Sequence, residues 1–509
     1  MNRISNGLGK LMTFGVGALG ACAVLFVLAM NLIWSSHVSL MEKVSIQPAG
    51  FLWLVPFALA LTGLYVLLRL EKKISERWLF LALTAVYLAA GLVLIFSVTD
   101  ILRADANTTY QAAQKFLNGD YSSFEASGYL GIYPQQLGVL LYDAFWGLFT
   151  ANTRILFLAN LAYTIAIDWL MWRMADLLFG HDHRVNLVTI ALSFAFLPQF
   201  FFIMFAYGLL VGFFFLCLGV WMLLRYHLGT GRGWWLVGGV ACLVLASFFK
   251  KNYLIGLLAV AIWELVLLVK ERKGRRAMVL LALALMYVGF YKAVPAVLEG
   301  TTGIELYDGA PSMLWVAMGT DPANDYMCHG WYNGYNWDTF HQCNFDTELA
   351  SQVAADKVKE NLAFYMEHPG AALRYFGVKL ASTWCEPTFG SVWSGPLDWC
   401  GQPSNTALTR SLYDQGKVFW LAYHGMKGLN VLVIAAALAG VFTQRRRFEA
   451  FGLPCLYLLG GLLFHLAWET KSQYVYTYLF LFIPLCAAAL AAGYSRVAGK
   501  KNQIREEAA

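Results

Sequence analysis

Charged side chains are scarce in this sequence of 509 residues: only 13% are Asp, Glu, Lys or Arg, while 59% are hydrophobic. A soluble protein of this length carries roughly 25% charged residues. Repeated apolar runs of about 20 residues, each long enough to cross the hydrocarbon core of a bilayer, account for the deficit. The shortage of charge therefore excludes a soluble globular protein and predicts an all-α polytopic membrane protein.

A large excess of basic charge is also missing, since the net charge is only +6. The basic residues cluster in short loops between apolar runs, which is the positive-inside pattern of membrane proteins and not the footprint of a nucleic-acid-binding protein. We therefore expect a multi-pass protein of the cell membrane, with a lipid bilayer and no nucleic acid as partner, and with these loops in the cytoplasm.

About twelve transmembrane helices place all the strongly basic loops on one side. The apolar stretch 137–149 is short for a full span, so we assign it to the outer surface as a juxtamembrane or re-entrant segment. If it crossed, the following helices would invert and the basic loops would lie outside. The expected spans are near 12–34, 51–70, 78–98, 155–178, 185–202, 208–226, 234–249, 253–269, 277–297, 428–443, 451–468 and 475–494.

This topology divides the chain into six parts. Two of them face outward: a loop with juxtamembrane helices and a long segment that is large enough to form a small extracytoplasmic domain. The parts are N-terminal transmembrane helices (1–98), the outward loop (99–153), a second transmembrane group (154–297), the extracytoplasmic domain (298–427), C-terminal transmembrane helices (428–494) and a cytoplasmic tail (495–509).

Short Cys-x-x-Cys motifs are missing as well, which disfavours a zinc site and leaves no metal ligands to assign. Four of the nine cysteines fall in the long outer segment, where disulfides would form. The simplest pairing joins the two pairs that are each separated by 15 residues, Cys328–Cys343 and Cys385–Cys400, although four cysteines permit two other pairings.

The outward loop from Thr99 to Gly138 carries two acids, Asp100 and Asp105, where the chain leaves its third apolar run. Carboxylates held at a membrane surface are where an enzyme acting on lipid-linked substrates would keep its general base. The loop is therefore the first candidate for a catalytic site.

A second group of polar residues borders the outer ends of the expected spans. Cations and acids that meet at one level of a helical bundle suit a site for a phosphate-bearing lipid. The alternative interpretation is that each is an interfacial residue whose charged end reaches water. The group comprises Arg103, Lys250, Lys251, Asn252, Lys292, His465, Glu469, Lys471, Gln473 and Tyr474.

Several different short motifs follow one another along the chain. In the outward loop they are Asp105 followed by Tyr110-Gln111-Ala112-Ala113, then Gly119-Asp120-Tyr121 and Tyr133-Pro134-Gln135-Gln136-Leu137-Gly138. Further on come Lys251-Asn252, Met318-Gly319, Gly330-Trp331-Tyr332-Asn333-Gly334-Tyr335-Asn336 and Trp468-Glu469-Thr470-Lys471-Ser472-Gln473-Tyr474. Their order and topology resemble the membrane-embedded C-type (GT-C) glycosyltransferases. The nearest branch is that of the protein O-mannosyltransferases and aminoarabinose transferases, in particular its uncharacterised Gram-positive bacterial members.

The resemblance implies an enzyme that moves a sugar, with inversion, from a polyprenyl-phosphate carrier to a glycan, glycolipid or protein acceptor outside the cytoplasm. Asp105 would be the base, with Asp100 as the other candidate. The donor phosphate would be bound by Lys251, Lys250, Lys292 and Lys471. The remaining substrate contacts would come from Arg103, Tyr133, Gln135, Asn252, Trp331, Asn333, His465, Glu469, Gln473 and Tyr474.

Two departures from the family pattern limit the carry-over. Three spans precede the catalytic-type loop, where many relatives have one, and the two acids are five residues apart instead of forming an Asp-x-Asp or Asp-Glu pair. These departures leave open which acid is the base and whether a divalent metal takes part. The alternatives are a lipid-linked-glycan polymerase or ligase, and a lipid or solute transporter or flippase, which would place polar residues at broken helices in mid-membrane.

Overall fold

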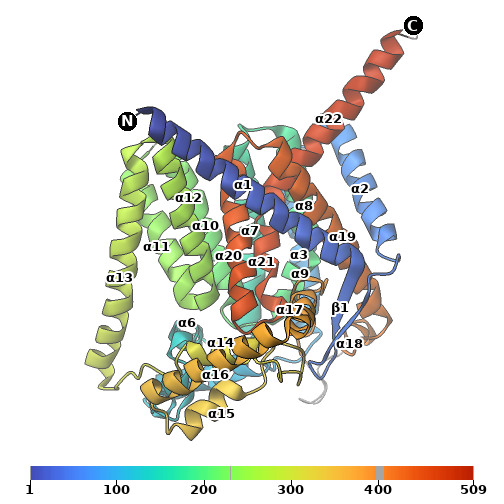
Figure 1. The fold of residues 1–509 in the computed structure, drawn as a ribbon. Coiled ribbons are helices and arrows are strands. Elements are labelled where there is room, and N and C mark those ends of the chain that lie inside the picture. The colour runs from blue at the N-terminus through green and yellow to red at the C-terminus, as the bar shows by residue number, and fades with distance from the viewer. Residues whose placement is uncertain (1, 230, 397–405, 508–509) are drawn as a thin grey trace.

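The computed structural model of the chain describes residues 2–229, 231–396 and 406–507 (Figure 1). Within these residues, eight helices are long and apolar enough to cross a membrane, and two further helix pairs, each bent by 48°, raise the number to ten. The protein is therefore an α-helical, multi-pass membrane protein. The eight are α1 (Asn2–Ile33), α3 (Glu76–Phe96), α7 (Arg154–Leu178), α10 (Leu209–Leu228), α12 (Leu254–Glu271), α13 (Gly274–Thr302), α19 (Lys417–Thr443) and α20 (Phe448–Ala467).

The two bent pairs and two short helices complete the bundle. The first pair joins α8 (His183–Ala195) to α9 (Leu197–Phe201) and η4 (Phe202–Met204); the second joins η7 (Ser472–Tyr474) and α21 (Tyr476–Phe480) to α22 (Ile483–Glu507). Two apolar helices, α2 (Leu54–Arg69) and α11 (Gly233–Phe249), have only 16 and 17 residues. The expected number of twelve spans depends on these two helices and stays a prediction.

Most of the remaining helices form what we call the distal layer, at the end of the bundle opposite the two termini (Figure 1). The stretch 137–149, expected not to cross, contributes a helix of 11 residues, α6, to this layer. The layer contains α4 (Asp105–Leu117), η2 (Ser122–Phe124), α5 (Tyr129–Ile132), η3 (Pro134–Gln136), α6 (Leu137–Gly147), α14 (Met313–Thr320), α15 (Tyr335–Gln342), α16 (Thr347–Glu367), α17 (Pro369–Trp384) and α18 (Ala407–Tyr413). Short 3-10 turns, η1 (Glu71–Lys73) and η5 (Lys251–Tyr253), join α2 to α3 and α11 to α12.

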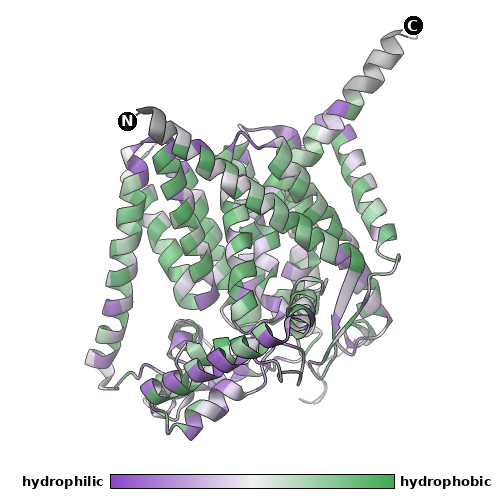
Figure 2. Ribbon diagram, viewed as in Figure 1, coloured by the Kyte–Doolittle hydropathy of each residue, from purple (hydrophilic) through white to green (hydrophobic). Residues whose placement is uncertain are grey.

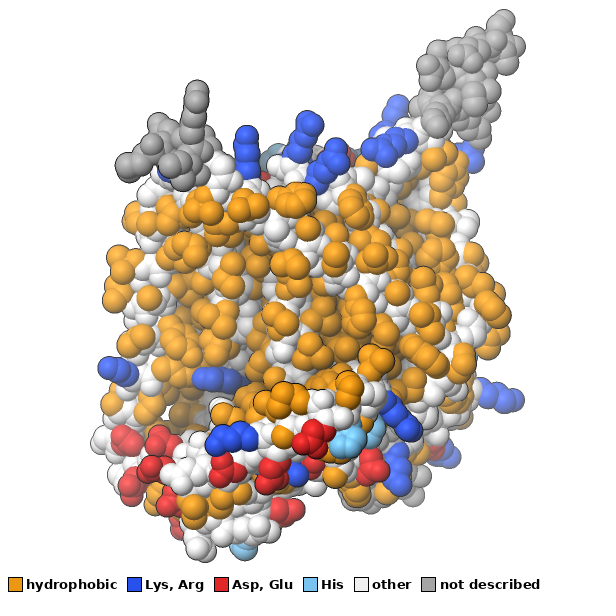
Figure 3. All heavy atoms as spheres, in the orientation of Figure 1, with side chains coloured by type: hydrophobic (Ala, Val, Ile, Leu, Met, Phe, Trp, Pro, Cys, Tyr) orange, Lys and Arg blue, Asp and Glu red, His pale blue; other side chains and the backbone are white. Residues whose placement is uncertain are grey.

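Hydropathy separates the bundle from the distal layer. Figure 2 shows predominantly hydrophobic helices in the bundle and mixed, more hydrophilic elements below them. In Figure 3, Lys and Arg side chains gather at the end that carries the termini, while Asp and Glu side chains gather on the distal layer. This asymmetry is the spatial counterpart of the positive-inside pattern in the sequence.

Close backbone contacts fix the distal end of α11. A Cβ atom on Gly138 would collide with the carbonyl oxygen of Phe248, and one on Gly208 would collide with that of Phe249. Gly208 also has a φ of +74°, which glycine adopts without a steric penalty. The loop before α10 and the start of α6 can therefore lie directly against the last turn of α11, which carries Lys250 at its end.

A two-stranded antiparallel hairpin, which the sequence pattern did not predict, follows α1. Strands β1 (Trp34–Val38) and β2 (Val44–Pro48) pair with Trp34 opposite Pro48 and Val38 opposite Val44. The Ser36 hydroxyl donates to the Ala381 carbonyl at 3.0 Å, and the Ser36 carbonyl accepts from the Tyr423 hydroxyl at 2.8 Å. The base of the hairpin is thus bonded to both α17 and α19.

The predicted disulfide between Cys328 and Cys343 is wrong. Both thiols are free and buried, and they lie in different apolar clusters: Cys328 packs with Val38 and Trp331, whereas Cys343 packs with Phe340. Equal sequence spacing did not bring the two sulfurs together, because the residues between them form a separate turn and helix. Cys385 is also free and buried, and its predicted partner Cys400 lies outside the described residues.

Candidate active site

Asp105 is the first residue of α4 and is exposed at the surface of the distal layer. The preceding Ala104 has φ +48° and ψ −128°, an unusual conformation for a residue with a Cβ atom. Such backbone strain costs on the order of 1–3 kcal/mol and is typical of functional sites. The helix N-terminus also favours a negative charge in its first turn. The carboxylate is therefore held at a strained corner where it stays accessible.

Lys250 follows α11 and is only 8% exposed. Its ammonium lies 3.7 Å from the centroid of the Tyr207 ring, a cation–π arrangement. Burial lowers the pKa of Lys250 to about 7, against the opposing influence of the Asp105 and Glu469 carboxylates. A small change in surrounding negative charge would therefore switch the protonation of this lysine near neutral pH.

Glu469 and Lys471 lie in the turn between α20 and η7. Glu469 is buried, and burial raises its pKa to about 7; Glu42 and Asp105 act in the same direction while Lys471 opposes them. Burial alone would lower the pKa of Lys471, but Glu42 and Glu469 hold it above the ordinary value. The Lys471 ammonium pairs with the Glu42 carboxylate at 2.5 Å. We call Glu42, Asp105, Lys250, Glu469 and Lys471 the carboxylate–lysine cluster.

A buried lysine from another element fixes this turn. The Lys379 ammonium, on α17, donates to the carbonyl oxygens of Gly319 at 2.6 Å, Leu466 at 2.9 Å and Trp468 at 2.8 Å. It thereby joins the end of α14 to the end of α20, immediately before Glu469. Because it satisfies three buried carbonyl groups, Lys379 has a structural role and is not a surface charge.

Tyrosine side chains surround the cluster. The Tyr129 and Tyr207 hydroxyls are 2.9 Å apart, and the Tyr129 and Tyr133 rings pack with centroids 5.2 Å apart. Burial raises the pKa of Tyr129, Tyr133 and Tyr332, and the negative charge of Asp105 adds to the effect in each case. These phenols are therefore neutral at physiological pH and can both donate and accept hydrogen bonds, which suits recognition of sugar hydroxyls.

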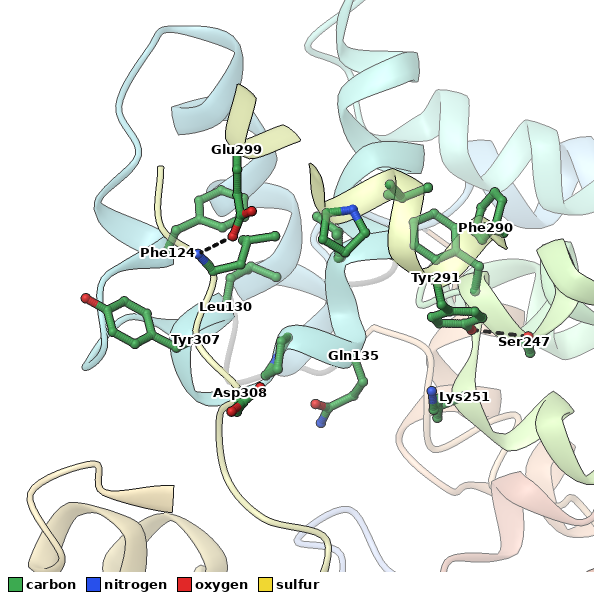
Figure 4. Close-up of a pocket in the computed structure, with 16 residues that line it drawn as sticks. Phe124, Leu130, Gln135, Ser247, Lys251, Phe290, Tyr291, Glu299, Tyr307 and Asp308 are labelled. Atoms are coloured by element: carbon green, nitrogen blue, oxygen red, sulfur yellow. Dashed lines mark hydrogen bonds between the residues drawn. The ribbon is translucent and has the colours of Figure 1, made fainter. Parts of the chain in front are cut away.

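A cavity of about 250 Å³ lies between the distal layer and the distal ends of α11 and α13, with Lys251, the chain neighbour of Lys250, in its wall (Figure 4). Its wall is mainly apolar, with Leu137, Phe248 and Val294 among the lining side chains, and its polar members include Gln135, Ser247, Lys251 and the acids Glu299 and Asp308. Figure 4 shows Gln135 and Lys251 on the same side of the cavity, away from Glu299. The cavity can take an apolar chain that carries a charged or polar end.

Several of the predicted substrate residues lie close to the cluster without belonging to it. The Arg103 guanidinium stacks on the Trp393 ring at 3.4 Å and donates to its carbonyl oxygen. The His465 and Tyr474 rings are stacked with centroids 5.7 Å apart. The Tyr474 backbone N–H donates to the Lys471 carbonyl oxygen at 3.2 Å, so this pair lies next to the cluster.

Other predicted residues have structural partners elsewhere. Asp100 pairs with Arg154 at 3.6 Å. Trp331 is buried and donates to the Ser382 hydroxyl at 2.9 Å. The remaining four are placed as follows: the Asn333 side chain accepts from the Tyr335 backbone, Gln473 accepts from the Ser394 hydroxyl, Asn252 is half-buried in η5, and Lys292 is exposed on α13.

Three residues of the site were missed by sequence reasoning: Glu42, Tyr129 and Tyr207. The signal for Glu42 was present, since the loop near 35–50 joins the first two expected spans and faces outward under the positive-inside rule. Tyr129 lay inside the outward loop as one of several aromatic residues. Nothing in the sequence separated Tyr207 from the other aromatic residues of its apolar segment.

Among the described residues, no group of three or more His, Cys, Asp or Glu side chains is arranged to hold a metal ion. Comparison with protein-family models, curated proteins and solved structures finds no match to this chain. Any functional assignment therefore depends on the chemistry of the carboxylate–lysine cluster and its cavity.

Proposed function

We propose that this protein is an integral-membrane glycosyltransferase that moves a sugar, with inversion, from a polyprenyl-phosphate carrier to an acceptor outside the cytoplasm. One observation carries the proposal. An accessible carboxylate, Asp105, and two lysines, Lys250 and Lys471, interact from separate segments at the distal end of the bundle, and Lys251, next in the chain to Lys250, lines a mainly apolar cavity. A base, a phosphate site and a lipid-chain site are the three parts that such a transfer needs.

The chemistry assigns one role to each charge. An acceptor hydroxyl attacks the anomeric carbon of the sugar and transfers its proton to the Asp105 carboxylate. The bond from the anomeric carbon to the phosphate oxygen breaks, and its electron pair leaves with the polyprenyl phosphate. Lys250 and Lys471 stabilise the negative charge that develops on this departing phosphate.

The cavity would bind the polyprenyl chain of the carrier. Isoprene units next to the phosphate would lie against Phe248, Phe290 and Val294, while Lys251 and Gln135 would meet the polar end. The acceptor would approach from the side of the distal layer. The basic loops at the opposite end of the bundle support an active site that faces outside the cytoplasm. A glycan, a glycolipid and a protein are all acceptors that this arrangement accommodates, so a polymerase or ligase would use the same chemistry.

The proposal is tested by removing the base. Asp105→Asn keeps the shape of the side chain but cannot accept the proton, so we expect transfer from a polyprenyl-phosphate sugar to fall by roughly 10² or more. The measurement is single-turnover sugar transfer by the purified protein in lipid nanodiscs. Asp100→Asn is the matched control, because Asp100 pairs with Arg154, and it should lose much less activity.

The reverse result would move the base to Asp100: near-normal transfer by Asp105→Asn and none by Asp100→Asn. If both variants transfer sugar normally, the glycosyltransferase proposal is wrong for this loop.

Transport is the second candidate, and the two bent helix pairs favour it. Asp168 is fully buried in the bundle and accepts from Gln199, on the α9 part of the first pair, at 2.9 Å. Buried acids at interrupted helices are typical of transporters. Asp168→Asn should abolish activity of a transporter in a vesicle-flux assay, whereas a glycosyltransferase should keep its sugar transfer in that variant.

A further inference from the structure

The tip of the β1–β2 hairpin contacts the carboxylate–lysine cluster. Glu42, at the tip, pairs with Lys471 at 2.5 Å, and the two side chains are only 13% and 16% exposed. The Leu40 carbonyl, also at the tip, accepts from the Arg103 guanidinium at 3.4 Å. A segment that is distant in sequence therefore delivers a carboxylate directly to one of the proposed phosphate-binding cations.

The base and the tip of the hairpin are held very differently. The base is bonded to α17 and α19 through Ser36, and the Val38 carbonyl accepts from Gln415 at 2.7 Å. The tip, residues 39–43, contacts other elements through the Leu40 carbonyl, which accepts from Arg103, and through the Glu42–Lys471 ion pair, and the Val44 N–H that follows it donates to the Met327 carbonyl at 3.1 Å. Within the tip, Glu42 adopts a φ of +63°, and Met41 is 77% exposed. The tip can therefore move while the base stays in place.

The charges of the cluster indicate what the Glu42–Lys471 ion pair does. Three acids of the cluster face two lysines, and Lys471 is already neutralised by contact with Glu42. A phosphate entering there would meet the Asp105 and Glu42 carboxylates and, at neutral pH, the partly ionised Glu469, and like charges in a partly buried site repel strongly. Exchange of the Glu42 carboxylate for the phosphate would keep the charge around Lys471 balanced.

We infer that Glu42 is a resident counter-anion that occupies the phosphate position at Lys471 and is displaced by the phosphate of the lipid carrier. The inference rests on the proposed function only in taking a lipid phosphate as the ligand. The hairpin tip then acts as a specificity device: an apolar lipid without an anionic group can fill the cavity but cannot release Glu42 from Lys471.

The test compares the binding of a fluorescent polyprenyl monophosphate with that of the corresponding neutral polyprenol, using the full chain in nanodiscs. Glu42→Gln removes the competing charge, so the monophosphate should bind about fivefold more tightly than it binds the wild type. Binding of the polyprenol should not change. Glu348→Gln, an exposed acid at the start of α16, is the matched control and should bind both lipids as the wild type does.

The combined variant Glu42→Gln/Lys471→Gln should not bind the monophosphate more tightly than the wild type, because the tighter binding requires the Lys471 ammonium that Glu42 no longer pairs with. A Glu42→Gln protein that binds the monophosphate no better than the wild type would overturn the inference and make Glu42 a support for Lys471. A spin label on Met41→Cys gives a reading that does not depend on a change at Glu42: its mobility should rise with the monophosphate and not with the polyprenol. Because both readings measure binding, they can succeed even if the Asp105→Asn and Asp100→Asn variants show that the proposed glycosyltransferase mechanism is wrong.

Discussion

Two consecutive lysines serve different surfaces. Lys250 lies over the Tyr207 ring and within the electrostatic influence of Asp105 and Glu469, whereas Lys251 lines the apolar cavity with its ammonium 4.6 Å from the Tyr291 ring centroid. Their order in the chain places a cation on each side of one backbone turn.

The protonation of Lys250 predicts a pH dependence of donor binding. Lys250 and Glu469 both have a pKa of about 7 in the free protein, and a bound phosphodiester, which carries one negative charge, raises both values. The complex therefore holds more protons than its separate parts, so affinity should rise as the pH falls from 8 to 6. Dissociation constants measured with the Asp105→Asn variant, which prevents turnover, give the test.

Lys250→Met should reduce this pH dependence, since only the Glu469 contribution is left. Lys115→Met is the matched control, because Lys115 is exposed at the other end of α4 and pairs with Asp120. An affinity that stays constant between pH 6 and 8 would contradict the assignment of these two groups to the phosphate site.

Sequence reasoning identified individual residues unevenly. Asp105, Lys250, Glu469 and Lys471 could be chosen because charge at the end of an apolar run is costly and therefore informative. Which way each side chain points could not be read in the same way. Trp331, expected to contact the substrate, is buried and packs with Val38 and Cys328, and Glu42 joins the cluster only through a hairpin that no periodicity in the sequence indicated.

Among the elements, α13 stands apart from the rest of the bundle (Figure 1). Its most apolar window is only 11% buried, so most of its surface faces lipid. Near its distal end, Phe290, Val294 and Pro295 line the cavity. One side of the cavity is thus a helix with few neighbours, a suitable entry for a membrane-borne substrate.

A bulky side chain on α13 should close the cavity. Val294→Trp would occupy the space proposed for the isoprene units, so the KM for the lipid-linked donor should rise by about tenfold or more while the protein still folds. Val297→Trp is the control on the same helix, because Val297 is 63% exposed outside the cavity and its substitution should leave the KM unchanged. Equal KM values for the two variants would show that the cavity does not bind the lipid-linked donor.

At the scale of elements, hydrophobic runs located nearly every membrane helix, because the bilayer imposes the same length on each of them. The disulfide expectation had no such constraint. Cys328 and Cys343 are related only by spacing, and the fold assigned them to different clusters. A hydropathy pattern could not predict the bend at Phe196 either, although Pro198, two residues later, interrupts the helix there.

For the whole molecule, the distribution of charge predicts one orientation in the membrane. Single cysteines at Ser75 and Gly274, introduced in a chain that lacks the exposed Cys22, should resist an impermeant thiol reagent in intact cells, while one at Ser123 should react. Labelling of the Gly274 position from outside would invert the orientation and place the carboxylate–lysine cluster in the cytoplasm.

Because α11 is short, the thickness of the bilayer affects the environment of Lys250. Its 17 residues span about 26 Å at 1.5 Å per residue, whereas a typical hydrocarbon core is about 30 Å thick. Since Lys250 follows its last residue, either the lipid thins locally or this lysine sits a few ångströms below the headgroups. A thicker membrane would submerge the ammonium further and make its charged form more costly. Acyl-chain length would then adjust the active site without touching a single residue of the protein.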